Sequence, residues 1–327
     1  MCCFTFFHAS IQLTSLFLPS VLFLLFYRSE TVPPSDSSTS LDSSVESGTS
    51  ETVVDIAVGD PGTFSSLVGF VTQADLVDTL STTNDITLFA PTNDAFTALS
   101  EAAPDVVSNL QTEEWQDHLV NLLLYHVLPV EVPSSAVTDG LTATTLNTED
   151  IDFTVSNGNG GGIFVNEGAE VVAADVDAKN GVIHVIDNVL LPSWVSNSIV
   201  DLAKATSDLS TLVDLVVQAE LVDTLSEAGP YTVFAPTNEA FAELLDDGTS
   251  LSADQVASVL TYHVVKGIYT EDALVDGLAL TTLQGEELVF RGIGNRVFAN
   301  DERIIIPNIL ANNGIVHVIK GVLIPEE

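Results

Sequence analysis

One ten-residue stretch occurs twice in this chain, and it constrains the fold more than any other feature. Residues 87–96 read Thr-Leu-Phe-Ala-Pro-Thr-Asn-Asp-Ala-Phe, and residues 232–241 read Thr-Val-Phe-Ala-Pro-Thr-Asn-Glu-Ala-Phe. In each copy an apolar strand runs into a proline, which lacks the backbone N–H needed to continue a sheet ladder. The threonine or asparagine that follows is suited to cap a helix, whose apolar face begins at Phe96 or Phe241. The stretch therefore predicts a strand-to-helix junction in each half of a duplicated chain.

Further paired segments extend the repeat. Apolar residues at helical spacing precede each junction. After the junction, both halves reach Leu-x-Tyr-His-Val, at residues 123–127 and 260–264. Both halves then end in apolar, β-branched runs joined by Asn-Gly, at residues 180–181 and 313–314. This last pattern predicts a hairpin, because both turn positions tolerate positive φ.

The order of these segments predicts the fold class and the domain organisation. Helices come first and strands last in each half, so we expect an α+β fold. The repeat divides the 327-residue chain into two tandem domains, domain 1 at residues 51–196 and domain 2 at residues 197–327.

The first 50 residues have a different composition. Within residues 1–28 an apolar core of Leu, Phe, Val and Ile predicts a secretory signal peptide or a signal anchor. No Lys or Arg precedes this core and no small-x-small site is obvious after it, so cleavage and membrane anchoring both stay open. Residues 29–50 are rich in Ser, Thr and Asp and contain no aromatic residue, which predicts a disordered linker suited to O-glycosylation.

Charge and cysteine content exclude several classes of function. The chain has 46 acidic and 8 basic residues, a formal net charge of −38, so neither nucleic acid nor electrostatic binding to an anionic membrane is expected. Both cysteines precede the domains, so no disulfide framework and no Cys/His metal site are expected. Motifs for nucleophilic catalysis, zinc or a cofactor are also missing, which favours a protein without catalytic residues, metal or cofactor. Weak calcium binding by the acidic surface stays open.

The only basic cluster of the domains lies in domain 2. Domain 1 has 22 acidic residues and one basic residue, a net charge of −21, whereas domain 2 has 20 and six, a net charge of −14. Three of the six are Arg291, Arg296 and Arg303. Two interpretations stay open for this cluster, namely contact with an acidic partner and simple solvation.

Together, these motifs resemble those of the fasciclin-like (FAS1) domain family. The Phe-Ala-Pro-Thr-Asn block is similar to the first signature of that family, the Asn-Gly-x-x-His-Val-Ile block to the second, and Tyr-His lies between them. The two copies cover about residues 52–327. The resemblance implies a wedge of β-sheet with flanking helices and an extracellular or cell-surface location. It also implies adhesion or matrix interaction, with a cell-surface or matrix protein or a polysaccharide as partner.

The resemblance further implies which residues bind a partner. The Tyr-His region of animal members is tied to integrin binding, and the matching positions here are Tyr125, His126, Tyr262 and His263. A purely structural role for these imidazoles is the competing interpretation. The alternative function is an enzyme acting on a glycan or small molecule, with the histidines and nearby carboxylates as its catalytic groups. That alternative requires a concave polar pocket around His126 or His263.

Overall fold

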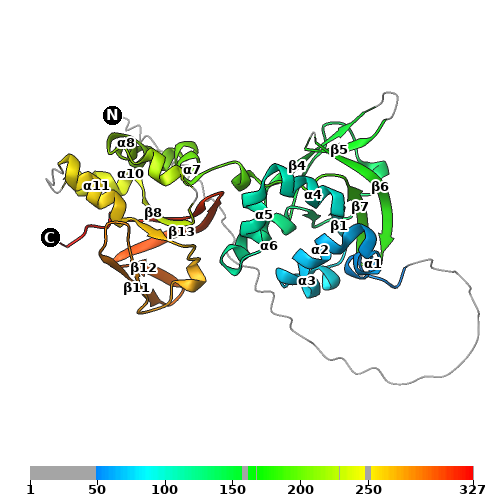
Figure 1. The fold of residues 1–327 in the computed structure, drawn as a ribbon, viewed down its shortest axis with the longest axis horizontal. Helices are drawn as coiled ribbons and strands as arrows, with labels where there is room; N and C mark the ends of the chain where they lie inside the picture. Colours follow the sequence, from blue (N-terminus) through cyan, green and yellow to red (C-terminus); the bar gives the residue numbers. More distant parts are fainter. Residues whose placement is uncertain (1–48, 157–160, 167, 228, 247–251, 327) are drawn as a thin grey trace, which may run out of the picture. The chain divides into compact units, whose positions relative to one another are not determined.

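Each domain folds as a seven-stranded sheet packed against helices (Figure 1). A computed structural model describes residues 49–326, except residues 157–160, 167, 228 and 247–251. The predicted leader, and all but the last two residues of the predicted linker, lie outside the described residues.

Domain 1 begins with helices and ends with strands, as the sequence predicts. Its sheet has the strand order β2-β1-β7-β6-β5-β4-β3. Its helices are α1 (Val53–Gly59), α2 (Pro61–Gln73), α3 (Val77–Thr82), α4 (Asn93–Ala102), α5 (Pro104–Leu110) and α6 (Gln116–Leu124). Its strands are β1 (Ile86–Pro91), β2 (Val127–Leu128), β3 (Thr142–Thr144), β4 (Asp150–Val155), β5 (Ile163–Val165), β6 (Ala169–Ala178) and β7 (Gly181–Ile186).

Domain 2 repeats this arrangement, with the strand order β10-β11-β12-β13-β14-β8-β9. Its helices are α7 (Ile199–Ala205), α8 (Ser210–Gln218), α9 (Val222–Ser226), α10 (Asn238–Asp246) and α11 (Ala253–Tyr262). Its strands are β8 (Tyr231–Pro236), β9 (Val264–Lys266), β10 (Ala279–Thr281), β11 (Glu287–Ile293), β12 (Arg296–Ala299), β13 (Glu302–Ala311) and β14 (Gly314–Ile319). The prediction of two tandem α+β domains is confirmed.

The repeated ten-residue stretch forms the predicted junction between strand and helix. In domain 1, β1 is buried along its whole length and ends at Pro91. The Thr92 hydroxyl then caps α4 by accepting a hydrogen bond from the backbone N–H of Ala95 at 3.2 Å. Asn93 ties the start of α4 to the start of α2, because its side-chain amide donates to the carbonyl oxygen of Gly62 at 2.9 Å. The motif is therefore part of the framework of the fold.

The centre of each sheet is a parallel pair between strands that lie far apart in the sequence. In domain 1, β1 pairs in parallel with β7, with Ile86 opposite Gly181. Gly181 also closes the predicted β6–β7 hairpin, which is confirmed. A Cβ at Gly181 would lie 1.9 Å from the carbonyl oxygen of Ile86, so no other residue fits this turn without moving β1.

The central strands are covered on both faces. Alternate residues of β1 point to opposite sides of the sheet, as the period of a strand requires. Ile86 and Leu88 pack into a cluster with the helices, whereas Phe89 packs with Phe153 of β4 in a second cluster on the other face. Each domain therefore holds an apolar core on both sides of its central strands.

Residues 47–327 cluster as one compact unit, and the buried ring of His118 joins the two domains within it. The His118 ring lies between Trp115 and Trp194, with ring centroids at 4.4 Å and 4.9 Å. Its Nε2 donates to the carbonyl oxygens of Ala311 and Gly314 at 3.1 Å and 3.2 Å, which fixes the tautomer with the proton on Nε2. Burial lowers the pKa of His118 to about 4, so the ring is neutral at physiological pH.

Candidate functional site

The structure places the predicted site residue Tyr125 in the interior of domain 1. Tyr125 directly follows α6 and is 5% exposed. Its hydroxyl donates to the carbonyl oxygen of Asp150 at 3.2 Å and accepts from the Asn166 amide at 2.8 Å. Burial raises the pKa of the phenol. The side chain thus connects the end of α6 to the β4–β5 hairpin.

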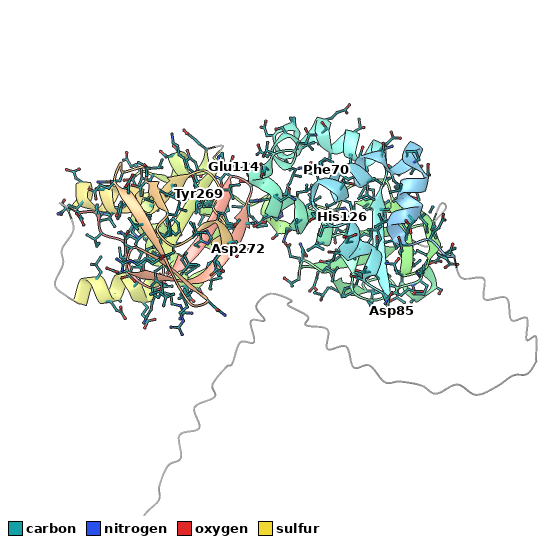
Figure 2. All side chains as sticks on the ribbon, turned by 90° about the horizontal axis from the view of Figure 1, so that it is seen from below. Phe70, Asp85, Glu114, His126, Tyr269 and Asp272 are labelled. Atoms are coloured by element: carbon teal, nitrogen blue, oxygen red, sulfur yellow. The ribbon has the colours of Figure 1, made fainter. Side chains whose placement is uncertain are left out.

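His126 lies beside it, inside domain 1 and 1% exposed (Figure 2). Its Nδ1 is 2.8 Å from the carbonyl oxygen of Leu122, so Nδ1 carries the proton and donates it. Its Nε2 accepts a hydrogen bond from the backbone N–H of Leu190 at 2.9 Å. Burial lowers the pKa of His126 to about 4. Both ring nitrogens are therefore occupied by backbone groups, and the ring stays neutral.

The same geometry recurs at Tyr262 and His263 in domain 2. The Tyr262 hydroxyl donates to the carbonyl oxygen of Glu287 at 3.1 Å and accepts from the Asn300 amide at 3.0 Å. The Nδ1 of His263 donates to the backbone carbonyl four residues earlier at 2.7 Å, and Nε2 accepts from the N–H of Leu323 at 2.9 Å. Burial lowers the pKa of this ring to about 4 as well. Tyrosine and histidine thus lie together in each domain and link three segments of it.

The histidines of the β-rich segments also bond to the backbone. In domain 2, the Nε2 of His317 donates to the carbonyl oxygen of Tyr269 at 2.7 Å, and Nδ1 accepts from the N–H of Asn308 at 3.2 Å. The His317 ring stacks on Phe234 with centroids 5.5 Å apart. His184 makes the equivalent bonds in domain 1. The interpretation of these two residues as structural histidines is confirmed.

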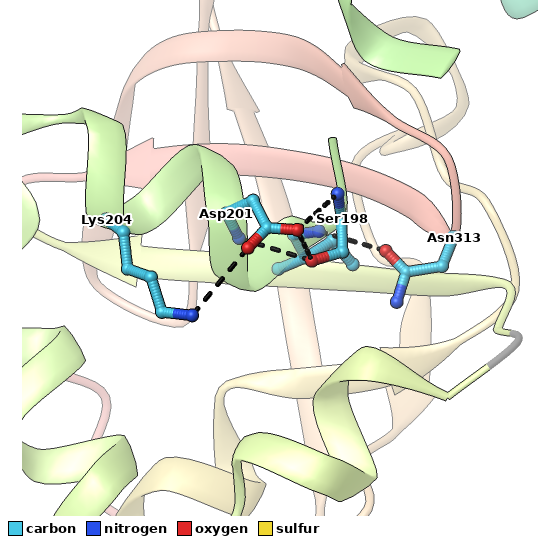
Figure 3. Close-up of polar contacts among 5 residues, drawn as sticks. Ser198, Asp201, Lys204 and Asn313 are labelled. Atoms are coloured by element: carbon cyan, nitrogen blue, oxygen red, sulfur yellow. Dashed lines mark hydrogen bonds and ion pairs between the residues drawn. The ribbon is translucent and has the colours of Figure 1, made fainter. Parts of the chain in front are cut away.

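The asparagine of the Asn-Gly hairpin has a role that sequence reasoning missed. The side-chain oxygen of Asn313 accepts from the N–H of Ile199 at 2.9 Å, at the start of α7 (Figure 3). Its amide donates to the carbonyl oxygens of Leu225 and Glu227 at 2.8 Å and 3.0 Å, at the end of α9. Asn180 makes the corresponding bonds in domain 1. Only the repetition of Asn before Gly in both halves hinted at this role.

The first turn of α7 is capped next to Asn313. Ser198 and Asp201 form a reciprocal capping box, in which the hydroxyl of Ser198 accepts from the backbone N–H of Asp201 (Figure 3). The hydrogen bonds from Ser198 hold the pKa of the Asp201 carboxyl below its usual value. Lys204 lies 3.6 Å from the same carboxylate, and both side chains are about half exposed, so this ion pair adds little stability.

Comparison with known proteins assigns the family. The family model of the fasciclin domain matches residues 62–192 and residues 207–325. The chain belongs to the fasciclin domain family. It is 31% identical over 245 residues to the transforming growth factor-beta-induced protein ig-h3 of Sus scrofa, covering 73% of this chain and 35% of that protein. It is 29% identical over 270 residues to periostin of Homo sapiens, covering 80% of this chain and 30% of that protein.

The chain thus spans about a third of the length of these two relatives. Among solved structures, a fasciclin domain pair from the insect cell adhesion molecule Fasciclin I is similar at 19% identity with a TM-score of 0.43. That likeness covers 80% of this chain and 97% of the solved chain.

Among the described residues, His126 and His263 are at most 2% exposed, so neither ring faces the concave polar pocket that the enzyme alternative requires. The cavity that His263 lines measures about 30 Å³ and is otherwise surrounded by aliphatic side chains of α7, α8 and α9 and their neighbours. Because both nitrogens of each ring already bond to the backbone, neither ring is placed to take a proton from a substrate.

The second fasciclin domain carries a polar hollow of about 1120 Å³ beside Tyr262. Arg291 lines it together with five acidic residues, namely Glu286, Glu287, Asp301, Glu302 and Glu326. Arg291 lies 3.3 Å from Asp301, and both of these side chains are largely exposed.

Among the described residues of both fasciclin domains, no group of three or more His, Cys, Asp or Glu side chains is arranged to hold a metal ion. None of the described helices has the length and apolar character needed to cross a membrane.

Proposed function

We propose that this chain is an adhesion or matrix-interaction protein, secreted or displayed at the cell surface, in which two fasciclin domains present their outer surfaces to a partner. The observation that carries the proposal is that the family model of the fasciclin domain matches both domains, at residues 62–192 and 207–325. Two weakly binding domains on one chain gain avidity without a strong single site.

The location of the motif residues supports contact with a partner over catalysis. The histidines and asparagines that recur in both domains bond to backbone groups inside the fold. What each domain offers to other molecules is therefore its outer surface. We propose that four buried residues contribute to partner binding indirectly, by holding that surface in place. These are Tyr125, His126, Tyr262 and His263, whose side chains are all at most 5% exposed.

The N-terminal sequence supports the proposed location. An apolar core within residues 1–28 suits entry into the secretory route, and the Ser/Thr-rich residues 29–50 suit a spacer in front of the domains. The proposed partner is a protein or polysaccharide of the cell surface or matrix. Mass spectrometry of the mature N-terminus distinguishes a cleaved leader from an anchor.

An adhesion assay with coated beads tests the proposal. Beads carrying the purified chain at increasing density are allowed to settle on cells and on extracted extracellular matrix, and are then sheared off. Because avidity multiplies weak contacts, we expect retention to rise steeply with coating density. Beads coated with the heat-unfolded chain are the control. Retention equal to that control at every density would contradict the proposed function.

A further inference from the structure

The outer face of the sheet in domain 2 carries a row of alternating cationic and aromatic side chains. Arg291 of β11 lies directly opposite Phe298 of β12, and Phe298 lies directly opposite Arg303 of β13. Residues directly opposite each other on antiparallel strands share one face of the sheet. The three side chains therefore form a row, arginine-phenylalanine-arginine, across three neighbouring strands.

A second row extends this pattern. Ile293 of β11 lies opposite Arg296 of β12 and is 62% exposed. Ile305, two residues beyond Arg303 on β13, is 38% exposed. All arginines of the described residues thus lie on β11, β12 and β13. We call the face formed by Arg291, Ile293, Arg296, Phe298, Arg303 and Ile305 the arginine face.

Domain 1 shows that the fold does not need these arginines. Its equivalent row consists of Thr154, Phe164 and Glu170, which are paired across β4, β5 and β6 in the same way. The phenylalanine is thus present in both domains, half-buried in each. The flanking cations occur only in domain 2. Because both domains have the same fold, folding alone does not explain why only domain 2 carries these arginines.

The charges on the arginine face are largely available to a ligand. The only ion pair found on it among the described residues joins Arg291 to Asp301, and that guanidinium remains 61% exposed. Exposed ion pairs of this kind contribute little to stability, so the arginine can readily exchange its carboxylate partner for another anion. In a chain with a net charge of −38, this face gathers three of the eight basic residues, with the carboxylates of Glu287 and Asp301 beside them.

We propose that the arginine face binds a linear acidic polysaccharide, through carboxylates of its uronic acid residues. The guanidinium fork matches a planar carboxylate and bonds to both oxygens. Neighbouring strands lie about 4.8 Å apart, so Arg291 and Arg303 emerge from strands separated by about 10 Å with the ring of Phe298 between them. A sugar ring has an apolar C–H side that packs on an aromatic ring, while acidic groups on its neighbours reach the two arginines.

Charge argues for a polysaccharide over a second copy of this chain. Two copies with a net charge of −38 each repel one another over the large area that a stable protein interface needs. A single polysaccharide strand contacts only the arginine face. At physiological ionic strength the Debye length is about 8 Å, so the acidic residues beyond that distance are largely screened from it, whereas Asp301 competes with the ligand for Arg291. This inference rests on the proposed function and names the chemical class of its partner.

Exchanging the row for its counterpart in domain 1 tests the inference. The double variant Arg291→Thr plus Arg303→Glu gives domain 2 the residues that domain 1 carries at these positions. The control Lys204→Glu plus Lys266→Thr makes the same change in net charge away from the arginine face. Binding of the full chain to polygalacturonate, dextran sulfate and neutral dextran is measured by affinity electrophoresis.

We expect the wild type and the lysine control to bind polygalacturonate equally and the arginine variant to bind about tenfold more weakly or not at all. Neutral dextran should not bind. Equal weakening by both variants, or binding of dextran sulfate without polygalacturonate, would overturn carboxylate recognition by this face. Self-association that depends on the arginines, without polygalacturonate binding, would also overturn it in favour of a second copy. Failure of the wild-type chain to bind polygalacturonate, with its bead adhesion retained, would refute this inference alone, since adhesion tests the proposed function independently.

Discussion

The neutral state of His126 leads to a measurable dependence of stability on pH. Its Nε2 accepts from the N–H of Leu190, so a second proton would remove this acceptor and place a charge in a buried site. The pKa is about 4 in the folded protein, against 6.5 for an imidazole exposed to water. The unfolded chain therefore binds a proton that the folded chain does not, and stability falls as the pH drops from 6.5 toward 4.

The size of the effect follows from the shift in pKa. Each pKa unit is equivalent to about 1.4 kcal/mol. Protonation of His126 in the unfolded chain therefore lowers the free energy of unfolding by about 2 kcal/mol when the pH falls from 7.5 to 5. In the variant His126→Gln the amide retains a donor and an acceptor but does not titrate. We expect this variant to be less stable than the wild type at pH 7.5, and the difference to shrink by about 2 kcal/mol at pH 5.

Urea denaturation at the two pH values measures this difference. Both tryptophans of the chain, Trp115 and Trp194, lie in domain 1, so their fluorescence reports on the domain that contains His126. Val127, the residue after His126, is fully buried and serves as the control position. The variant Val127→Ala loses apolar contacts, which should lower the free energy of unfolding by about 2 kcal/mol. Its difference from the wild type should be the same at both pH values. An equally constant difference for His126→Gln would refute the claim that burial keeps this ring neutral.

Three further predictions concern the framework and are measured by the same denaturation. Asn313→Ala leaves three backbone groups without partners and should lower the free energy of unfolding by about 3 kcal/mol. The neighbouring variant Asn312→Ala should lower it by less than about 1 kcal/mol. Gly314→Ala should prevent stable folding of domain 2, since its Cβ would lie 1.9 Å from a carbonyl oxygen. At Gly294, with positive φ but open space, alanine should cost only about 1 kcal/mol. Thr92→Ala removes the cap of α4 and should cost about 1 kcal/mol. Equal losses of stability at Asn313 and Asn312, or at Gly314 and Gly294, would contradict the structural roles given to Asn313 and Gly314.

Local chemistry explains what the sequence predicted correctly. The end of β1 at Pro91 and the cap at Thr92 depend on a missing donor and a nearby hydroxyl, which the residue types alone reveal. The Asn-Gly turns are equally local. The second copy of each motif supplied the rest, because a pattern that occurs twice in the same order marks a duplicated domain.

Features that depend on tertiary register were not predictable in the same way. The reach of Asn93 back to the start of α2 joins two helices that only the fold brings together. The row of Arg291, Phe298 and Arg303 depends on the registers of two hairpins, so in the sequence it was only a loose basic cluster. The resemblance assigned Tyr125 and Tyr262 to partner binding, and the fold places both in the interior, where their role in binding remains a proposal.

The parallel pairing at the centre of each sheet has a consequence for how the chain is made. Domain 1 cannot complete its sheet until β7 has been synthesised, because β1 pairs with β7 and with the short strand β2. At that point the ribosome has not yet produced any strand of domain 2, whose first strand begins at Tyr231. The first domain therefore has time to close before its homologue appears. Since the two sheets have the same strand order and similar central strands, this delay protects β1 and β7 from pairing with their counterparts β8 and β14 in the wrong domain.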